Sequence, residues 1–239
     1  MKRFLVFLCA IILVISMAGM AGATSILYFN DGVLGTDRMG EALTSLSPTY
    51  TTTTVTSSFA FATEIASGAY DLGILMVQGY YSPAYADGIY ALGAFVAAGG
   101  LGIYTDWWRD NTFAALFDAQ WTGEVNDTLV TVTDPSLAVG LTNPVELYNP
   151  GWGVFSMDVG GVLAAVFADG AGAISIGNDG RSIVNGFLTD TFVDGAQGVQ
   201  LYVNEITYLF EGAVPEPATM LLLGTGLIGL AGLRRKFRN

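Results

Sequence analysis

The chain has no histidine, and its single cysteine, Cys9, lies near the amino terminus. Without histidine, catalytic triads that use an imidazole as general base are excluded, together with metal sites built on histidine ligands. If the segment before residue 24 is removed, the mature protein has no cysteine either. Cysteine nucleophiles, thiolate metal sites and disulfides are then excluded as well, although an exported protein is free to form disulfides.

Basic residues are also scarce. Lys plus Arg number 9, against 21 Asp plus Glu. Between residues 24 and 213 the basic residues are Arg38, Arg109 and Arg181, against 20 acidic residues, so this part carries a formal charge of −17. A surface so acidic repels nucleic acids and anionic lipid headgroups. We therefore expect no nucleic-acid partner.

The first 23 residues have the pattern of a secretory signal peptide. Lys2 and Arg3 provide the positive start, residues 4–17 are apolar, and Ala21-Gly22-Ala23 supplies small residues for cleavage. We expect signal peptidase to cut after Ala23. The alternative is an N-terminal membrane anchor that is not cleaved.

The tail, residues 214–239, combines three parts in a fixed order. Val214 is followed by Pro215-Glu216-Pro217, then by an apolar run over 218–233, and then by basic residues. The run would span ~24 Å as a helix, less than the ~30 Å of a hydrocarbon core, so it predicts a marginal transmembrane helix. The basic cluster would stay on the cytoplasmic side of the inner membrane. It consists of Arg234, Arg235, Lys236 and Arg238.

This tail closely resembles the PEP-CTERM sorting signal of Gram-negative bacteria. The resemblance implies that the tail holds the protein in the inner membrane for a time. It also implies that an exosortase, a membrane protease-transpeptidase, then cuts near Pro215-Glu216-Pro217 and releases or transfers the protein outward. The alternative is a plain single-span anchor in which the two prolines only stiffen a linker.

Residues 24–213 are enough for one globular domain with a sizeable core. Apolar runs typical of strands alternate with segments of helical spacing in the first half. This alternation predicts an α/β fold, a doubly wound and mostly parallel sheet flanked by helices. Strands are expected at 25–30, 50–57, 71–77 and 101–104, helices at 37–47, 59–67, 84–98 and 107–117, with Thr105-Asp106 as N-cap of the last.

Shorter extended pieces fill the second half before a final helix. Asn178-Asp179-Gly180 between two apolar runs predicts a hairpin turn. Val199, Val203, Ile206 and Phe210 lie at helical spacing and predict an amphipathic helix over one face of the sheet. The extended pieces are expected at 123–133, within 145–157, and at 163–168, 173–177 and 181–187, and the final helix at 195–210.

The order of these pieces resembles the class I glutamine amidotransferase-like superfamily, which has a flavodoxin-like fold. The resemblance rests on residues 26–29, Tyr70-Asp71, the helix-Gly99-Gly100-strand step, and residues 180–187. It implies a nucleophilic cysteine on a sharp turn after the strand at 101–104 and a histidine later in the chain. Neither is present, so this chemistry is not carried over. A generic Rossmann-like or flavodoxin-like domain is the alternative.

One loop offers candidate ligand-binding residues. Asp106, Trp107, Trp108, Arg109 and Asp110 follow a predicted strand at its carboxyl end, where open α/β sheets bind ligands. Tryptophan stacks on apolar sugar faces, and the charged side chains would fix hydroxyl groups. Trp121 and Trp152 would be further members of the platform. The alternative is that these tryptophans pack a helix against the sheet.

Other site types have weaker support. Asp-Gly turns such as Asp169-Gly170 supply calcium-type oxygen ligands, but no loop has the spacing of a known calcium motif. Gly32-Val33-Leu34-Gly35 lacks the full spacing and the lysine of a phosphate loop. We expect no metal and no cofactor. Asp106 and Asp110 would be the acid and base of a divergent carboxylate-based hydrolase.

Together these features predict a non-enzymatic exported protein of the cell surface or extracellular matrix, associated with exopolysaccharide or biofilm. The alternatives are a carbohydrate-binding module that uses the tryptophan loop, and the carboxylate-based hydrolase. The expected partners are signal peptidase, the exosortase and the inner membrane during export, and extracellular polysaccharide afterwards.

Overall fold

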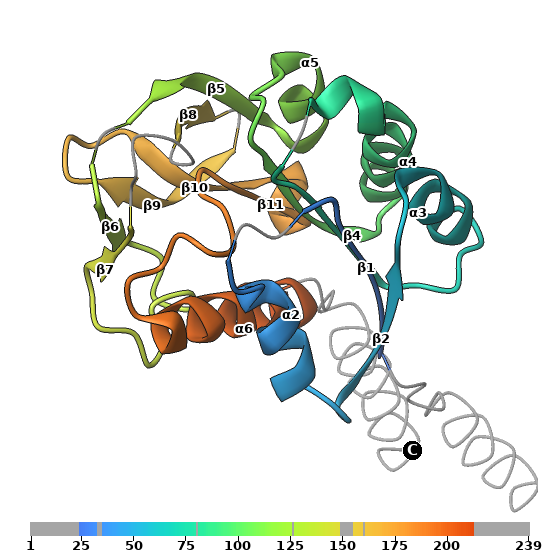
Figure 1. Ribbon diagram of the computed structural model, residues 1–239, viewed down its shortest axis with the longest axis horizontal. Helices are drawn as coiled ribbons and strands as arrows, with labels where there is room; N and C mark the ends of the chain where they lie inside the picture. Colours follow the sequence, from blue (N-terminus) through green and yellow to red (C-terminus); the bar gives the residue numbers. More distant parts are fainter. Residues whose placement is uncertain are drawn as a thin grey trace, which may run out of the picture.

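The computed structural model describes residues 24–32, 35–79, 81–125, 127–148, 155–159 and 161–212 (Figure 1). The predicted signal peptide at 1–23 and the tail at 214–239 lie outside the described residues, as do Val33-Leu34 and Trp152. Among the helices of the described part, none has the length and hydrophobicity needed to cross a bilayer. The predicted transmembrane segment at 218–233 lies outside that part.

The first half of the domain forms the parallel part of one sheet. Its strands are β1 (Thr24–Asn30), β2 (Tyr50–Val55), β3 (Leu72–Val77) and β4 (Leu101–Asp106), joined by β11 (Ser182–Asn185). They lie side by side in the order β2-β1-β3-β4-β11, and every neighbouring pair is parallel. All residues of β3 and β4 are buried, because helices cover both faces of the sheet.

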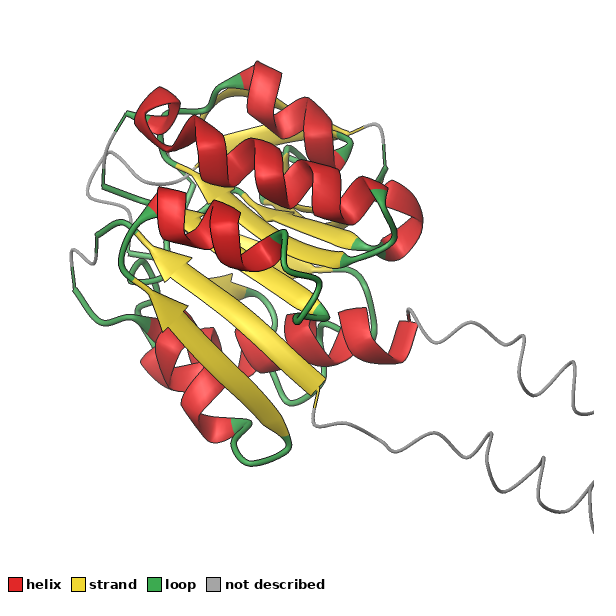
Figure 2. Ribbon diagram, turned by 90° about the vertical axis from the view of Figure 1, so that its right-hand side faces the viewer, coloured by secondary structure: helices red, strands yellow, loops and turns green. Residues whose placement is uncertain are grey.

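Helices cover the two faces of this sheet (Figure 2). On one face lie α2 (Arg38–Ser45) and α6 (Gly195–Gly212), which bury Met39 and Ile206 against Ile26 and Ile74. On the other face lie α3 (Ser58–Ile65) and α4 (Ala86–Ala97). The predicted doubly wound α/β fold is therefore confirmed.

Capping residues define the ends of three helices. Asp37 and Ser57 cap α2 and α3 by accepting the amides of Gly40 and Ala60. Gly99 follows the end of α4 with φ of 106°, a conformation in which a side chain would be strained. A 3₁₀ turn, η1 (Ser82–Tyr85), precedes α4.

The second half extends the sheet with antiparallel strands. From β11 the order continues through β10 (Gly172–Gly177), β9 (Val162–Phe167), β6 (Leu129–Val132) and β7 (Val145–Glu146). Two further strands, β5 (Ala119–Glu124) and β8 (Phe155–Val159), pair with each other, and β8 also pairs with β10. The sheet is thus mixed, whereas a mostly parallel sheet is predicted, because the short strands of the second half pair antiparallel with one another.

The hairpin predicted at Asn178-Asp179-Gly180 is confirmed. β10 and β11 pair antiparallel, and the turn between them, η3 (Asn178–Gly180), holds Asn178 and Asp179 at φ of 50° and 57°. Asn and Asp tolerate this left-handed region better than other side chains.

One predicted helix boundary is wrong. Thr105 and Asp106 do not cap a helix, because β4 continues through Asp106, which is paired with Val77 of β3. The N-cap is Asp110, and the helix that follows consists of α5 (Asn111–Ala114) and the 3₁₀ turn η2 (Ala115–Phe117). Residues 107–110 therefore form a turn beyond the end of a strand.

The two ends of the domain lie close together. Thr24, the first residue of β1, is the register partner of Tyr50 in β2. The Tyr50 ring stacks on Phe210, in the last turns of α6, with a centroid distance of 4.8 Å. Both ends therefore lie at the amino edge of the parallel strands, opposite the edge where residues 107–110 are found.

Candidate functional site

The carboxyl edge of the parallel strands is the natural place for a site in this fold. Because the strands are parallel, the residues that follow β1, β3, β4 and β11 meet at one edge. Most of the polar side chains found there form hydrogen bonds with other groups of the domain.

Gln78, directly after β3, links two other segments at this edge. Its side-chain amide donates to Asn30 Oδ1 at 2.8 Å, and its Oε1 accepts from the Thr189 backbone N–H at 2.6 Å. The backbone amides of Gln78 and Gly79 donate to Asp31 Oδ1 at 2.6 and 3.1 Å. Burial raises the pKa of the Asp31 carboxyl, and these two hydrogen bonds oppose the rise.

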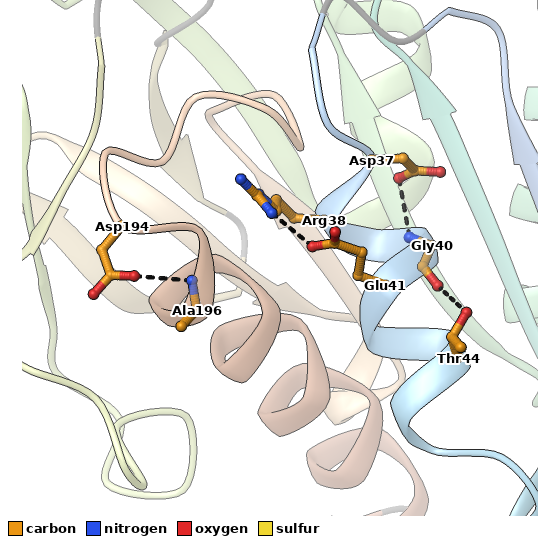
Figure 3. A network of polar contacts seen from close by, with 7 residues as sticks. All are labelled: Asp37, Arg38, Gly40, Glu41, Thr44, Asp194 and Ala196. Carbon is orange, nitrogen blue, oxygen red and sulfur yellow. Dashed lines mark hydrogen bonds and ion pairs between the residues drawn. The ribbon is translucent and has the colours of Figure 1, made fainter.

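The same chain of hydrogen bonds continues to helix α2. Asn30 Nδ2 donates to the Tyr28 hydroxyl at 3.0 Å, and this hydroxyl donates to the Asp37 carboxylate, 2.7 Å from the nearer oxygen. Asp37 in turn accepts from the Gly40 N–H at 3.0 Å as the cap of α2 (Figure 3). Burial, reinforced by the Asp37 charge, raises the pKa of Tyr28 far above its ordinary value. These side chains hold the edge together.

Asp106 organises the turn after β4. Its side chain is fully buried, and its two oxygens accept the backbone N–H groups of Trp108 at 2.8 Å and Asp110 at 3.0 Å. Burial raises the pKa of Asp106, while these hydrogen bonds oppose the rise. Between them Arg109 has φ of 62°, so the carboxylate holds the turn in an uncommon backbone conformation.

Asp110 is also used locally. Its Oδ1 accepts the Thr112 N–H at 2.8 Å and caps α5. The two carboxylates proposed from the sequence as an acid–base pair are thus close together, but each binds backbone amides. This arrangement stabilises a turn, with Asp106 buried and Asp110 half-buried.

The tryptophans separate into different environments. Trp107 is half-buried against the core on the α4 side, and Trp121 of β5 is only 5% exposed. Trp121 is therefore a core residue rather than part of a platform, as the packing alternative predicts. Trp108 is 52% exposed and contacts Tyr81 edge to face, at a centroid distance of 4.8 Å and an interplanar angle of 87°.

Sequence reasoning missed Tyr81. It follows β3 just before the 3₁₀ turn η1, so it lies at the same edge as Trp108. The available signal is its position, since aromatic residues placed after neighbouring parallel strands are brought together at the carboxyl edge.

A cleft of about 350 Å³ opens at the same edge, beside the ends of β1 and β2. Asn30, Asp31 and Phe59 are among its lining residues. At its border the Ser58 hydroxyl contacts Asp87 and donates to the Tyr85 carbonyl. Within the described residues, no group of three or more Asp, Glu, His or Cys side chains is arranged to hold a metal ion.

A buried acid lies beneath this edge, on the α6 side of the sheet. Glu205 is fully buried and accepts a hydrogen bond from Asn185 Nδ2 at 3.0 Å. Burial raises its pKa to about 8, although this hydrogen bond opposes the rise. The sequence gives little sign of it, because Glu205 is one of 20 acidic residues in the domain.

Comparison with known proteins identifies the tail and the fold. Residues 213–236 match the PEP-CTERM protein-sorting motif, as the tail's resemblance predicts. The motif implies an exported protein that crosses the membrane and is processed by an exosortase. No curated protein sequence matches the chain.

Two solved structures show the fold of the domain. A putative GMP synthase component from Thermoplasma acidophilum is 16% identical, with a TM-score of 0.57 over 80% of this chain and 96% of that one. A glutamine amidotransferase from Thermotoga maritima is 11% identical, with a TM-score of 0.51 over 83% of this chain and 93% of that one. At such identities the likeness concerns the fold alone, and it confirms the glutamine amidotransferase-like architecture.

Proposed function

We propose that this exported protein acts without catalysis at the cell surface or in the extracellular matrix, in contact with exopolysaccharide. The observation that carries the proposal is the turn after β4. The resemblance to glutamine amidotransferases implies a nucleophilic cysteine there, and the chain instead has Asp106-Trp107-Trp108-Arg109-Asp110 and no histidine.

The hydrogen bonds of the turn argue in the same direction. A general acid or base must reach its substrate with a free carboxyl oxygen. Both oxygens of Asp106 accept backbone amides and the side chain is buried, so this carboxylate acts as an internal brace. One oxygen of Asp110 accepts a backbone N–H as the cap of α5. A carboxylate-based hydrolase centred on this pair has no exposed acid–base couple to work with.

The composition suits a place outside the cell. The domain has no cysteine to be oxidised, and its formal charge of −17 favours solubility over adhesion to anionic surfaces. Signal peptidase and the exosortase act on its two ends. An acidic domain of this kind would then lie among neutral polymers of a biofilm matrix.

The test is a search for turnover with the processed protein recovered from cells. We expect no hydrolysis of polysaccharides, nitrophenyl glycosides, nitrophenyl esters or glutamine above the rate in buffer. Turnover by the purified protein would overturn the proposal, and its loss in Asp106→Asn but not in Asp118→Asn would assign the activity to the turn after β4. Circular dichroism spectra of both variants would show that a lost activity does not reflect a lost fold.

A further inference from the structure

Two large aromatic rings are left half in solvent at the carboxyl edge. Tyr81 is 47% exposed and Trp108 is 52% exposed, and they contact each other although they come from the loops after β3 and β4. Single exposed aromatic residues are ordinary on a protein surface. A contacting pair from two loops forms a small apolar patch on which a ligand with an apolar face could stack.

The backbone beneath both rings is held in place. The Trp108 N–H donates to the buried Asp106 carboxylate at 2.8 Å, and the preceding residue, Trp107, donates its N–H to the Val77 carbonyl at 2.8 Å. On the other loop, the Tyr81 carbonyl accepts the Ala84 N–H at 2.9 Å. Because the backbone of Trp108 and Tyr81 is already held by these hydrogen bonds, a ligand that stacks on the rings would not have to order these two residues first.

We propose that Tyr81 and Trp108 form a platform that binds pyranose rings of a neutral polysaccharide, an inference that rests on the non-enzymatic surface role. About half of each side chain remains exposed beside the edge-to-face contact, and apolar C–H faces of sugars stack on exposed aromatic rings. In this proposal Asp110, two residues after Trp108, would accept a sugar hydroxyl with Oδ2, the oxygen that does not cap α5.

The charge of the domain selects the class of polysaccharide. Three arginines against 20 acidic residues give the domain a large net negative charge, which repels uronic-acid polymers. A neutral chain of hexoses or pentoses meets no such penalty. The same field disfavours an acidic protein as the occupant of the platform.

The experiment uses the processed protein in affinity electrophoresis. Gels contain xyloglucan, glucomannan or mixed-linkage β-glucan as neutral polymers, or alginate as the anionic one. We expect retardation by at least one neutral polymer and none by alginate. Trp108→Ala and Tyr81→Ala should each weaken this retardation about tenfold or more, the loss expected for an aromatic residue at the centre of a contact.

Tyr90→Ala is the matched control. Tyr90 is 50% exposed and also contacts another ring, Phe113, but it lies on α4 outside the pair. It should leave retardation unchanged, and Trp108→Phe should keep most of it. The proposal is overturned if no neutral polymer retards the protein, if both alanine variants bind like the parent, or if alginate binds equally well.

The outcome for the platform is separate from the outcome for the proposed function. Retardation without breakdown of the polymer supports both ideas. Breakdown of a retarding polymer would overturn the non-enzymatic role and leave the platform standing as a substrate-binding surface. An absence of both retardation and breakdown would overturn the platform and leave the non-enzymatic role standing.

Discussion

The Glu205 side chain is fully buried between α6 and the sheet, with Asn185 Nδ2 as a donor at 3.0 Å. Its other oxygen, Oε1, and the Asn185 Oδ1 atom are both buried without a partner in the described structure. Both atoms are acceptors when the carboxyl is ionised. A proton on Oε1 would turn this unpartnered acceptor into a donor, which agrees with the neutral acid that burial favours.

The neutral form of Glu205 makes the stability of the folded protein depend on pH. The pKa of Glu205 is about 8 in the folded protein against an ordinary value of 4.5, so between these values the folded state binds more protons than the unfolded state. Its contribution to stability is complete below pH 4.5 and declines as the pH rises toward 8, by about 1.4 kcal/mol per pH unit.

We therefore expect Glu205→Gln to flatten the pH dependence of stability. A glutamine amide can donate to Asn185 Oδ1 and never ionises, so the variant should gain melting temperature relative to the parent as the pH rises from 5 to 8. A gain of about 2–4 °C for each kcal/mol is typical of a domain of this size. The measurement is thermal unfolding by circular dichroism across that range.

Glu211→Gln is the control, because Glu211 lies near the end of the same helix with its side chain exposed. Its melting temperature should change with pH in the same way as that of the parent. A parallel curve for Glu205→Gln as well would show that Glu205 is ionised in the folded protein.

At the scale of elements, α2 depends on a side chain that serves two partners. Asp37 caps the helix at Gly40 (Figure 3). It also accepts a hydrogen bond from the buried Tyr28 hydroxyl. Removing it takes away the cap, worth about 1 kcal/mol, and leaves a buried phenol without its acceptor, a loss of about 1–3 kcal/mol. Asp37→Ala should therefore lower the free energy of unfolding by about 2–4 kcal/mol, measured by urea titration.

Asp194→Ala is the matched comparison. Asp194 stands at the start of α6, beside α2, and its exposed carboxylate accepts the Ala196 N–H at 2.9 Å (Figure 3). Since no buried group depends on it, we expect a loss of about 1 kcal/mol. Equal losses for the two variants would mean that Tyr28 finds another partner when Asp37 is removed.

Local chemistry explains why most elements of the first half could be predicted from the sequence. Strands of unbroken apolar residues such as β3, helical spacing in α2, and Gly99 after α4 are signals carried by neighbouring residues. The start of α5 was misplaced because Asp106 and Asp110 both have N-cap chemistry. Pairing of Asp106 with Val77 of β3 decides between them, and that contact is not local.

The order of the antiparallel strands and most of the site could not be predicted from neighbouring residues in the sequence. β6 pairs with β9, and β8 with both β5 and β10, so their neighbours are set by packing between distant segments. The sequence could place Asp106 to Asp110 at a strand end. It could not show that Gln78 binds Asn30 and Thr189, which are 48 and 111 residues away from it in the chain.

At the scale of the whole molecule, the tail carries the motif that implies processing by an exosortase. We expect replacement of Pro215-Glu216-Pro217 by alanines to abolish exosortase processing, because the motif at 213–236 would be incomplete. The unprocessed protein should then accumulate in the inner membrane, as cell fractionation with intact-mass analysis would show. Pro135→Ala, at an exposed turn outside the motif, should be processed normally. Release of a shortened triple-alanine protein would contradict the expectation.

Thr24 and Phe210 lie close together, because both are neighbours of Tyr50. The two ends of the domain therefore share its amino edge, and the carboxyl edge lies opposite them. The expected signal peptide and the sorting tail join the described domain at this amino edge, so a domain tethered through them would have its carboxyl edge outward. A six-residue strand rising ~3.3 Å per residue separates the amino edge from the carboxyl edge by ~20 Å. Tyr81 and Trp108 would thus already face the matrix while the protein is still tethered. Cleavage of the tail would then release the domain without changing the binding surface at its opposite edge.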